Sequence, residues 1–163
     1  MPHQDTVLPL RNIKIALQKE FTLTIEVESK DFTRFKINNL LQLNFVNDIS
    51  NRYGEIIVTQ NGFLIDNIEN ILSNKLTAVI GRDNPKDIFD IYLISKLYKI
   101  NWTNILKSAH EKAGFSNEEL IIRLKSFPTK LLQEINIIDE DFLDHFEDVF
   151  KNVIKNIENV SLN

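Results

Sequence analysis

Four ionisable residues in the central part of the chain have the types and spacing to act together. Lys75 falls in the middle of an apolar stripe at helical spacing, and Arg82 follows a few residues after that stripe. Asp87 and Asp90 lie three residues apart, so on a helix their carboxylates share one face and could jointly meet a cation or a metal ion. Because an ammonium on a partly desolvated surface is a strong partner for phosphate, this stretch predicts a charged binding site.

Each of these residues also has an ordinary structural explanation. Lys75 could lay its apolar stem on the core and extend its ammonium to water. Asp87 could serve only as an acid in the first helical turn, after an N-cap at Asn84. Asp90 is harder to explain in this way, because a carboxylate within an apolar helix is costly unless paired. The nearest cations in sequence for that pairing are Lys75 and Arg82, so a structural ion pair remains the alternative.

Two predicted helices position the four residues. Asp66 and Glu69 have capping-box spacing, which predicts a helix from there to about residue 80 with Gly81 as its C-cap. Asn84 and Pro85 then predict a new N-cap and first helical position, for a helix to about residue 98. This second helix is apolar nearly all round, so we expect it to be central and largely buried.

The residues before this pair of helices have the period of strands. Residues 21–27 alternate strictly between apolar and polar, and residues 32–37 and 41–46 continue the pattern around an Asn38-Asn39 turn. Shorter strands are expected over residues 55–59 and 63–65. Further helices are expected over residues 11–20, 102–113, 118–125 and 141–159, the last with an apolar core face at Phe142, Phe146, Val149, Phe150 and Val153.

The predicted fold class is therefore α+β, with an antiparallel or mixed N-terminal sheet followed by a C-terminal helical bundle. The chain has 163 residues, which suits one domain over residues 1–163, with a sheet part at 11–66 and a helical part at 67–163. It has no cysteine, no apolar run long enough to span a bilayer and no signal-peptide pattern at its start, so we expect a cytoplasmic protein without a membrane partner.

The remaining charged residues predict little chemistry. The net charge is −4 with basic residues scattered among acidic ones, which argues against general nucleic-acid binding. His3, His110 and His145 stand in unrelated segments, so we predict surface positions for them and no histidine metal site. The acidic run at 139–141 precedes a helix and is expected to cap it.

The central stretch resembles the signature of the AbiEii/AbiGii family. In residues 70–79 a Lys75-Leu-Thr-Ala sequence matches the family's lysine-bearing helix, Arg82 matches its arginine, and Lys86-Asp87-Ile-Phe-Asp90-Ile-Tyr matches the run that follows. The resemblance covers roughly residues 17–102. It implies a nucleotidyltransferase of the DNA polymerase β superfamily, many members of which are toxins of bacterial abortive-infection toxin–antitoxin pairs.

The resemblance also implies roles for individual residues. Asp90, Asp87 and Lys75 would be catalytic, Lys75, Arg82 and Lys86 would bind nucleotide, and the cofactors would be Mg²⁺ and a nucleoside triphosphate. The superfamily's Gly-Ser turn and Asp-x-Asp metal ligands are absent from this chain, so no metal ligand is assigned here and we expect the N-terminal catalytic half to lie outside it. The N-terminal sheet would then be a remnant of the nucleotidyltransferase core.

One further departure concerns the strand over residues 41–46. Asn44 stands where the superfamily would have its third carboxylate, and an amide is a poorer Mg²⁺ ligand because it brings no charge. Asp48 is the nearest replacement, out of register for that strand face.

Two functions follow from the sequence. The first is an enzyme, or part of one, whose missing half is an N-terminal segment or another chain. The second is a non-catalytic module that keeps the charged cluster as a structural network and acts by protein contact, with a cognate antitoxin as the expected partner. We expect Asp90→Asn to separate them, since it would be costly only in the second case.

Overall fold

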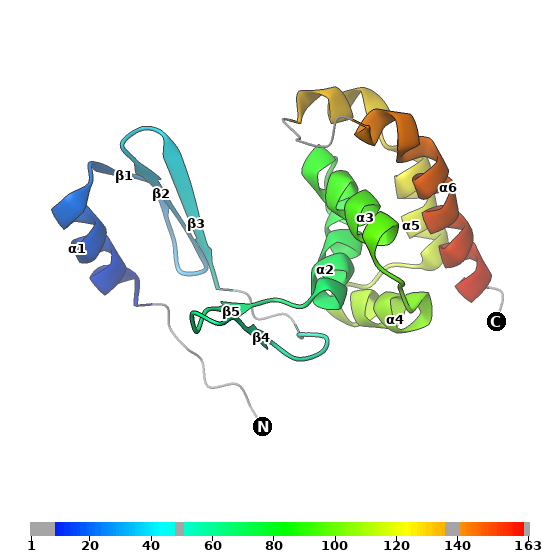
Figure 1. Ribbon diagram of the computed structural model, residues 1–163, viewed down its shortest axis with the longest axis horizontal. Helices are drawn as coiled ribbons and strands as arrows, with labels where there is room; N and C mark the ends of the chain where they lie inside the picture. The colour runs from blue at the N-terminus through cyan, green and yellow to red at the C-terminus, as the bar shows by residue number, and fades with distance from the viewer. Residues whose placement is uncertain (1–8, 48–50, 136–140, 162–163) are drawn as a thin grey trace. The chain divides into compact units, whose positions relative to one another are not determined.

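The computed structural model describes residues 9–47, 51–135 and 141–161 (Figure 1). The chain forms two compact units, Met1–Ser50 and Asn51–Asn163, which are described separately. The predicted α+β class is confirmed, with a sheet near the N-terminus and helices after it. The prediction of a single domain remains a prediction.

The first unit is a helix followed by a three-stranded antiparallel sheet, so the alternative of a mixed sheet is set aside. It contains α1 (Leu10–Glu20), β1 (Leu23–Glu28), β2 (Phe32–Ile37) and β3 (Leu41–Val46), in the strand order β1-β2-β3. The central strand buries Thr33, Phe35 and Ile37, which alternate along it as a strand with one covered face requires. The predicted Asn38-Asn39 turn is confirmed: both residues have positive φ, of 50° and 58°.

The second unit is a short hairpin followed by a helical bundle. The hairpin pairs β4 (Ile57–Val58) with β5 (Leu64–Ile65). It was predicted with the sheet part, but it belongs to the unit that contains the bundle. The bundle consists of α2 (Ile68–Gly81), α3 (Pro85–Leu97), α4 (Trp102–Lys112), α5 (Asn117–Ser126), the 3₁₀ helix η1 (Thr129–Glu134) and α6 (Phe142–Ser161). Only the 3₁₀ helix was not predicted.

The bundle core joins α3 to α6 through aromatic side chains. Tyr92 of α3 is fully buried and meets the ring of Phe142 edge to face, with 4.8 Å between centroids. Phe146 and Phe150 continue the cluster along α6, stacked 4.7 Å apart. The predicted core face of α6 is thus confirmed, with Val149 only partly buried. Within the described residues no helix combines the length and apolar character needed to cross a membrane.

The predicted start of α2 is wrong by one residue. Asn67, not Asp66, is the N-cap: its side chain accepts a hydrogen bond from the Asn70 amide at 2.7 Å. Gly81 is the last residue of α2 rather than its C-cap. The start of α3 is confirmed, because Asn84 accepts from the Lys86 amide at 3.0 Å and Pro85 takes the first helical position.

Candidate functional site

Lys75, Arg82, Asp87 and Asp90 come together where α2 meets α3, and we refer to these four residues as the charged cluster. Lys75 projects from the middle of α2, and Arg82 is the C-cap of that helix. Asp87 and Asp90 lie in the first two turns of α3. The Asn84-Pro85 start fixes the direction of α3 immediately after α2, so the two helices pack side by side and the four residues can meet.

The charged cluster is organised around Asp87. One carboxylate oxygen of Asp87 accepts from Lys75 Nζ at 2.9 Å, and the other accepts from Arg82 Nε at 2.7 Å. Lys75 Nζ also lies 2.6 Å from Asp90 Oδ2. The side chain of Asp87 is 1% exposed, whereas those of Asp90 and Arg82 are 35% and 57% exposed. The centre of the cluster is therefore dry and its two ends reach solvent.

The ionisation of the cluster follows from this pairing. Burial alone would raise the pKa of Asp87, but the hydrogen bonds from Arg82 and Lys75 outweigh it and the pKa is lowered. Burial would lower the pKa of Lys75, but its hydrogen bonds to Asp90 and Asp87 raise it overall. The bond to Asp87 likewise raises the pKa of Arg82. All these groups are thus held in their charged forms.

The two carboxylates differ in burial and in partners. Asp87 lies in the first turn of α3, as one of its two explanations required, but its side chain also binds both cations of the cluster. We expected Asp90 to be the buried carboxylate in need of a partner; its partner is Lys75, as predicted, but it is about one-third exposed. Lys86 is exposed on α3, and no side-chain contact joins it to the cluster among the described residues.

The cluster does not fit a divalent metal ion. Both oxygens of Asp87 already accept hydrogen bonds from cations. Lys75, one of these cations, is also paired with Asp90. Binding Mg²⁺ there would place a third cation against carboxylates that already balance two. In the described part of the chain no third acidic or histidine side chain gathers with them. Mg²⁺ therefore has no place in the cluster as these residues are arranged.

The two cations of the cluster balance its two carboxylates, and among the described contacts Arg82 is the member with donors open to an anion. Asp87 accepts a hydrogen bond from the Nε atom of the Arg82 guanidinium, and the Arg82 side chain is more than half exposed. The two terminal nitrogens of arginine can then present a fork of donors to a phosphate or carboxylate. Lys75 lies on the other side of the same carboxylate, which places two cations around one fixed anion.

A comparison of the chain with protein-family models, curated proteins and solved structures finds no match. The resemblance of residues 17–102 to the AbiEii/AbiGii family therefore stays a prediction that rests on the residues of the signature.

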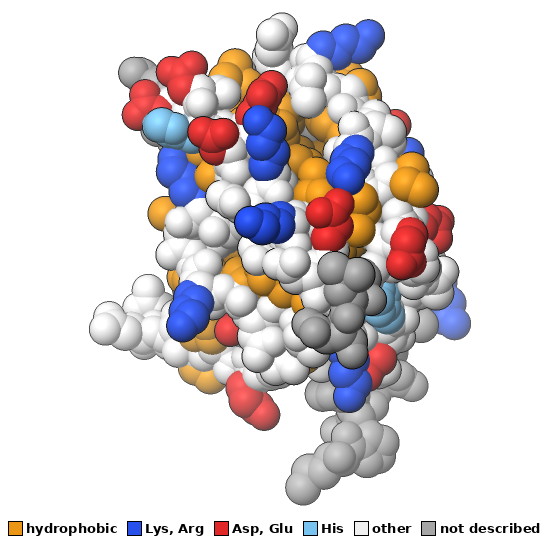
Figure 2. Space-filling model, turned by 90° about the vertical axis from the view of Figure 1, so that its right-hand side faces the viewer, with side chains coloured by type: hydrophobic (Ala, Val, Ile, Leu, Met, Phe, Trp, Pro, Cys, Tyr) orange, Lys and Arg blue, Asp and Glu red, His pale blue; other side chains and the backbone are white. Residues whose placement is uncertain are grey.

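Two hollows in the bundle lie away from the charged cluster. One, of about 470 Å³, is lined by residues of α4, α5 and α6 that include Lys107 and Glu111. The other, of about 410 Å³, lies between the end of α3 and α6 and includes Lys99 and Asn152. The cluster does not line either hollow. On the face shown in Figure 2, acidic and basic side chains are interspersed among apolar ones, and a mixed surface of this kind produces no strong long-range field.

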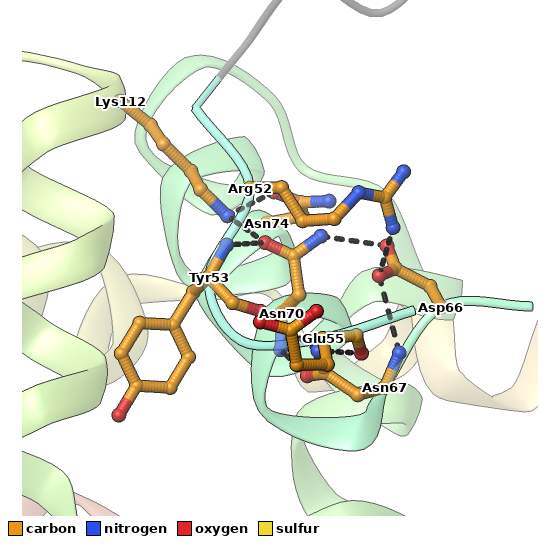
Figure 3. A network of polar contacts seen from close by, with 8 residues as sticks. All are labelled: Arg52, Tyr53, Glu55, Asp66, Asn67, Asn70, Asn74 and Lys112. Atoms are coloured by element: carbon orange, nitrogen blue, oxygen red, sulfur yellow. Dashed lines mark hydrogen bonds and ion pairs between the residues drawn. The ribbon is translucent and has the colours of Figure 1, made fainter. Parts of the chain in front are cut away.

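A second polar network was not predicted from the sequence. The side chain of Asn67 donates to the carbonyls of Tyr53 and Glu55 at 2.8 and 2.9 Å while it caps α2 (Figure 3). Asn70 is buried; its Oδ1 accepts from the Tyr53 amide and its Nδ2 donates to Asp66. We refer to the contacts of Asn67 and Asn70 as the asparagine network.

The asparagine network contacts α4 on one side and an ion pair on the other. Lys112 of α4 donates to the side chains of Asn70 and Asn74, both at 2.6 Å. On the other side, Asp66 is paired with Arg52. A lone pair of asparagines three residues apart gives a weak sequence signal, because capping alone explains such residues. The network binds the loop at 52–55 to α2 and α4.

The other predicted residues take no part in the charged cluster. Asn44, on β3, is exposed and accepts from Arg34 Nε at 3.1 Å. His145 is at the surface as predicted, but His110 is half-buried with its ring against Phe115, 4.8 Å between centroids. Surface exposure was wrong for His110 because its ring packs edge to face against Phe115, which covers part of it. Residues 3, 48, 139 and 140 lie outside the described residues.

Proposed function

We propose that this chain is a nucleotidyltransferase-like protein whose charged cluster contacts the phosphates of a nucleoside triphosphate. The observation that carries this proposal is the arrangement of Lys75 and Arg82 on either side of one buried carboxylate, with the Arg82 side chain more than half exposed. Charge-assisted hydrogen bonds from lysine and arginine are the usual means of holding phosphate groups. Lys86, also exposed on α3, adds a nearby positive charge.

Asp87 and Asp90 act in this proposal as positioning residues. Asp87 holds Arg82 and Lys75 through its two oxygens, and Asp90 holds Lys75 from the solvent side. A lysine fixed by two carboxylates loses little side-chain freedom when a phosphate arrives. This proposal therefore gives the two aspartates, which the resemblance implies to be catalytic, the task of orienting the two cations.

The transfer of a nucleotidyl group needs metal-binding carboxylates that the charged cluster does not supply. In this proposal the Mg²⁺ ligands come from an N-terminal segment or another chain, and this chain contributes phosphate contacts. By resemblance to the AbiEii/AbiGii family we further propose a cytoplasmic protein of the abortive-infection toxin type, with a cognate antitoxin as its partner.

The proposal is tested by calorimetric titration of each nucleoside triphosphate into the chain, with Mg²⁺ and then with a chelator. Arg82→Ala and Lys75→Ala should each weaken binding about 10- to 100-fold, since each removes a charge-assisted hydrogen bond of about 1.5–3 kcal/mol. The matched control is Lys125→Ala, which removes an exposed lysine paired to Glu158 at 2.9 Å. Because the cluster does not fit Mg²⁺, binding should persist in the chelator.

Absence of binding at millimolar nucleotide, or equal binding by wild type and both cluster variants, would overturn the phosphate site. It would favour the second candidate function, a binding module that acts through protein contacts. The observation that supports that alternative is the complete pairing of Asp87, which also suits a purely structural network.

A further inference from the structure

The hollow between the end of α3 and α6, which we refer to as the α3–α6 hollow, has the size of a small-molecule site. Its volume of about 410 Å³ falls within the range of ligand pockets, about 300–1,000 Å³. The residues that line it come from the last turn of α3, the connection at 98–101, the start of α4 and one side of α6. All of them belong to the second unit, and none of them belongs to the charged cluster.

The α3–α6 hollow is positively charged although the chain is acidic. Lys96 and Lys99 line it, and no acidic side chain does so among the described residues. The chain as a whole has 23 acidic and 19 basic residues. The hollow between α4, α5 and α6 is different, because Lys107 and Glu111 both line it and their charges balance. Of these two hollows, the α3–α6 hollow is therefore the one suited to an anion.

The helix ends beside the α3–α6 hollow do not cancel this charge. The last carbonyls of α3, which ends at Leu97, carry partial negative charge, and the first amides of α4, which begins at Trp102, carry partial positive charge. The two ends flank one short connection, so their partial charges offset one another. Lys96 is also held in place, since its Nζ lies 5.4 Å from the centroid of the Tyr92 ring. The two lysines thus set the sign of the local field.

Two aromatic side chains offer the α3–α6 hollow surfaces for a planar group. Tyr98, the C-cap of α3, is 50% exposed, and Trp102 is half-buried at the start of α4. No ring contact joins either one to another aromatic side chain within the described residues. Val149 and Val153 add apolar surface from α6. A flat aromatic group can pack against these rings, and aromatic stacking of this kind does not depend on charge.

Polar groups in the α3–α6 hollow have hydrogen-bonding capacity left over. Ser95 Oγ is buried and has no hydrogen-bond partner among the described residues. A buried hydroxyl in this state is costly unless a bound group or water meets it. Asn152 and Asn156 lie one turn apart on α6, so both amides share the face that lines the hollow. Each amide can both donate and accept, which suits the polar edge of a planar ligand.

We infer that the α3–α6 hollow binds a small planar aromatic anion. The side chains of Tyr98 and Trp102 contact the ring system of this ligand. The ammonium groups of Lys96 and Lys99 bind its carboxylate or phosphate group, since lysine forms charge-assisted hydrogen bonds with either. Both lysines are exposed, so solvent screens them and the ring contacts are needed to hold the ligand.

The first test follows Trp102 by nuclear magnetic resonance. Trp102 is the chain's single tryptophan, so its indole N–H gives one signal in an isotope-labelled chain and reports on the α3–α6 hollow directly. Phenylacetate and AMP represent the carboxylate and the phosphate, with phenylacetamide and adenosine as their uncharged counterparts. We expect an anion at millimolar concentration to shift the signal saturably, and its uncharged counterpart to bind about 10-fold more weakly or less. The anion that binds more tightly identifies the anionic group.

Two lysine variants then locate the anionic group of the ligand. Lys96→Gln and Lys99→Gln remove the charge and keep most of the side chain, so each should weaken binding of that anion about 10-fold. The matched control is Lys107→Gln, which removes an exposed lysine from the other hollow and should leave the affinity unchanged. All three lysines are exposed, so we expect the variants to fold, and circular dichroism verifies it.

Four results would overturn this inference. A Trp102 signal that none of the probes moves would mean that the hollow takes no ligand of this class. Equal binding of an anion and its uncharged counterpart would remove the lysines from the site. An equal shift with inorganic phosphate alone would mean that the rings recognise nothing. Equal losses in Lys107→Gln and the two variants would indicate a general charge effect. The proposed triphosphate contacts at the charged cluster are measured by other variants, so either proposal can fail without the other.

Discussion

Replacing Asp87 by asparagine should destabilise the helical unit more than any other single change in the charged cluster. The substitution keeps the shape of the side chain but removes the charge that two cations share. The amide oxygen can still accept from one of them, while the amide nitrogen presents a donor to the other. Because Asp87 is 1% exposed, water cannot replace the lost interaction at the centre of the cluster.

The size of the effect can be worked out from the two bonds. The Lys75 bond lies at the drier end and should contribute about 1.5–3 kcal/mol, as hydrogen bonds to charged groups do. Arg82 is 57% exposed, so its bond is screened and should contribute about 0–1 kcal/mol. The expected cost of Asp87→Asn is therefore roughly 1.5–4 kcal/mol. Asp90→Asn should cost about 1 kcal/mol or less, because Lys75 keeps Asp87 and Asp90 is already one-third exposed.

Urea unfolding followed by Trp102 fluorescence measures these costs. Trp102 is the chain's single tryptophan and lies at the start of α4, so its emission reports on the helical unit. Asp87→Asn should lower the urea midpoint at unchanged slope, and Asp90→Asn should shift it much less. The reasoning is refuted if Asp87→Asn costs under about 0.5 kcal/mol, the range of ordinary surface changes, or if Asp90→Asn costs as much.

Three further outcomes are expected. The stabilisation from Asp87 is complete above its ordinary carboxyl pKa of 3.8 and is lost as pH falls through its lowered folded-state pKa, so the wild type and Asp87→Asn should converge in urea titrations below pH 3.8. Gly54→Ala should cost more in thermal melts than Gly62→Ala, by about 1–3 kcal/mol: both glycines have positive φ, but only at position 54 would a Cβ lie 2.8 Å from a side-chain nitrogen. Ser73 and Ser108 share a buried hydrogen bond of 2.9 Å, so either alanine variant should cost about 1–3 kcal/mol and the double variant less than the sum of the two in a mutant cycle.

Local chemistry made the strands and most helix ends predictable. The Asn38-Asn39 turn fixes the β2–β3 hairpin because both residues tolerate positive φ. Asn84 and Pro85 fix the start of α3 for reasons confined to one turn of chain. The start of α2 was misplaced because its cap depends on the carbonyls of Tyr53 and Glu55, which lie 14 and 12 residues away in sequence.

The sequence predicted which four residues form the charged cluster, but not which of its carboxylates is buried. The i, i+3 spacing placed Asp87 and Asp90 on one helix face, with Lys75 and Arg82 as the nearest cations in sequence. The structure brings these four residues together, without a described contact to Lys86. Which carboxylate is buried depends on the rotation of α3 about its axis. That rotation is hard to read from a helix that is apolar nearly all round. Lys112 could not be assigned to the asparagine network, because it reaches Asn70 across 42 residues of sequence.

All four residues of the charged cluster lie in one short stretch of chain, from Lys75 to Asp90. Only the connection at 82–84 separates the two helices that carry them. Bringing its members together closes only a small loop, so the entropic cost of assembling it is low. Contacts of this kind form early, ahead of those that need distant segments. The helix pair of α2 and α3 is thus suited to be the folding nucleus of its unit. In that case the residues proposed to hold phosphate would also determine how fast the bundle forms, and substitutions there would change folding rates as well as binding.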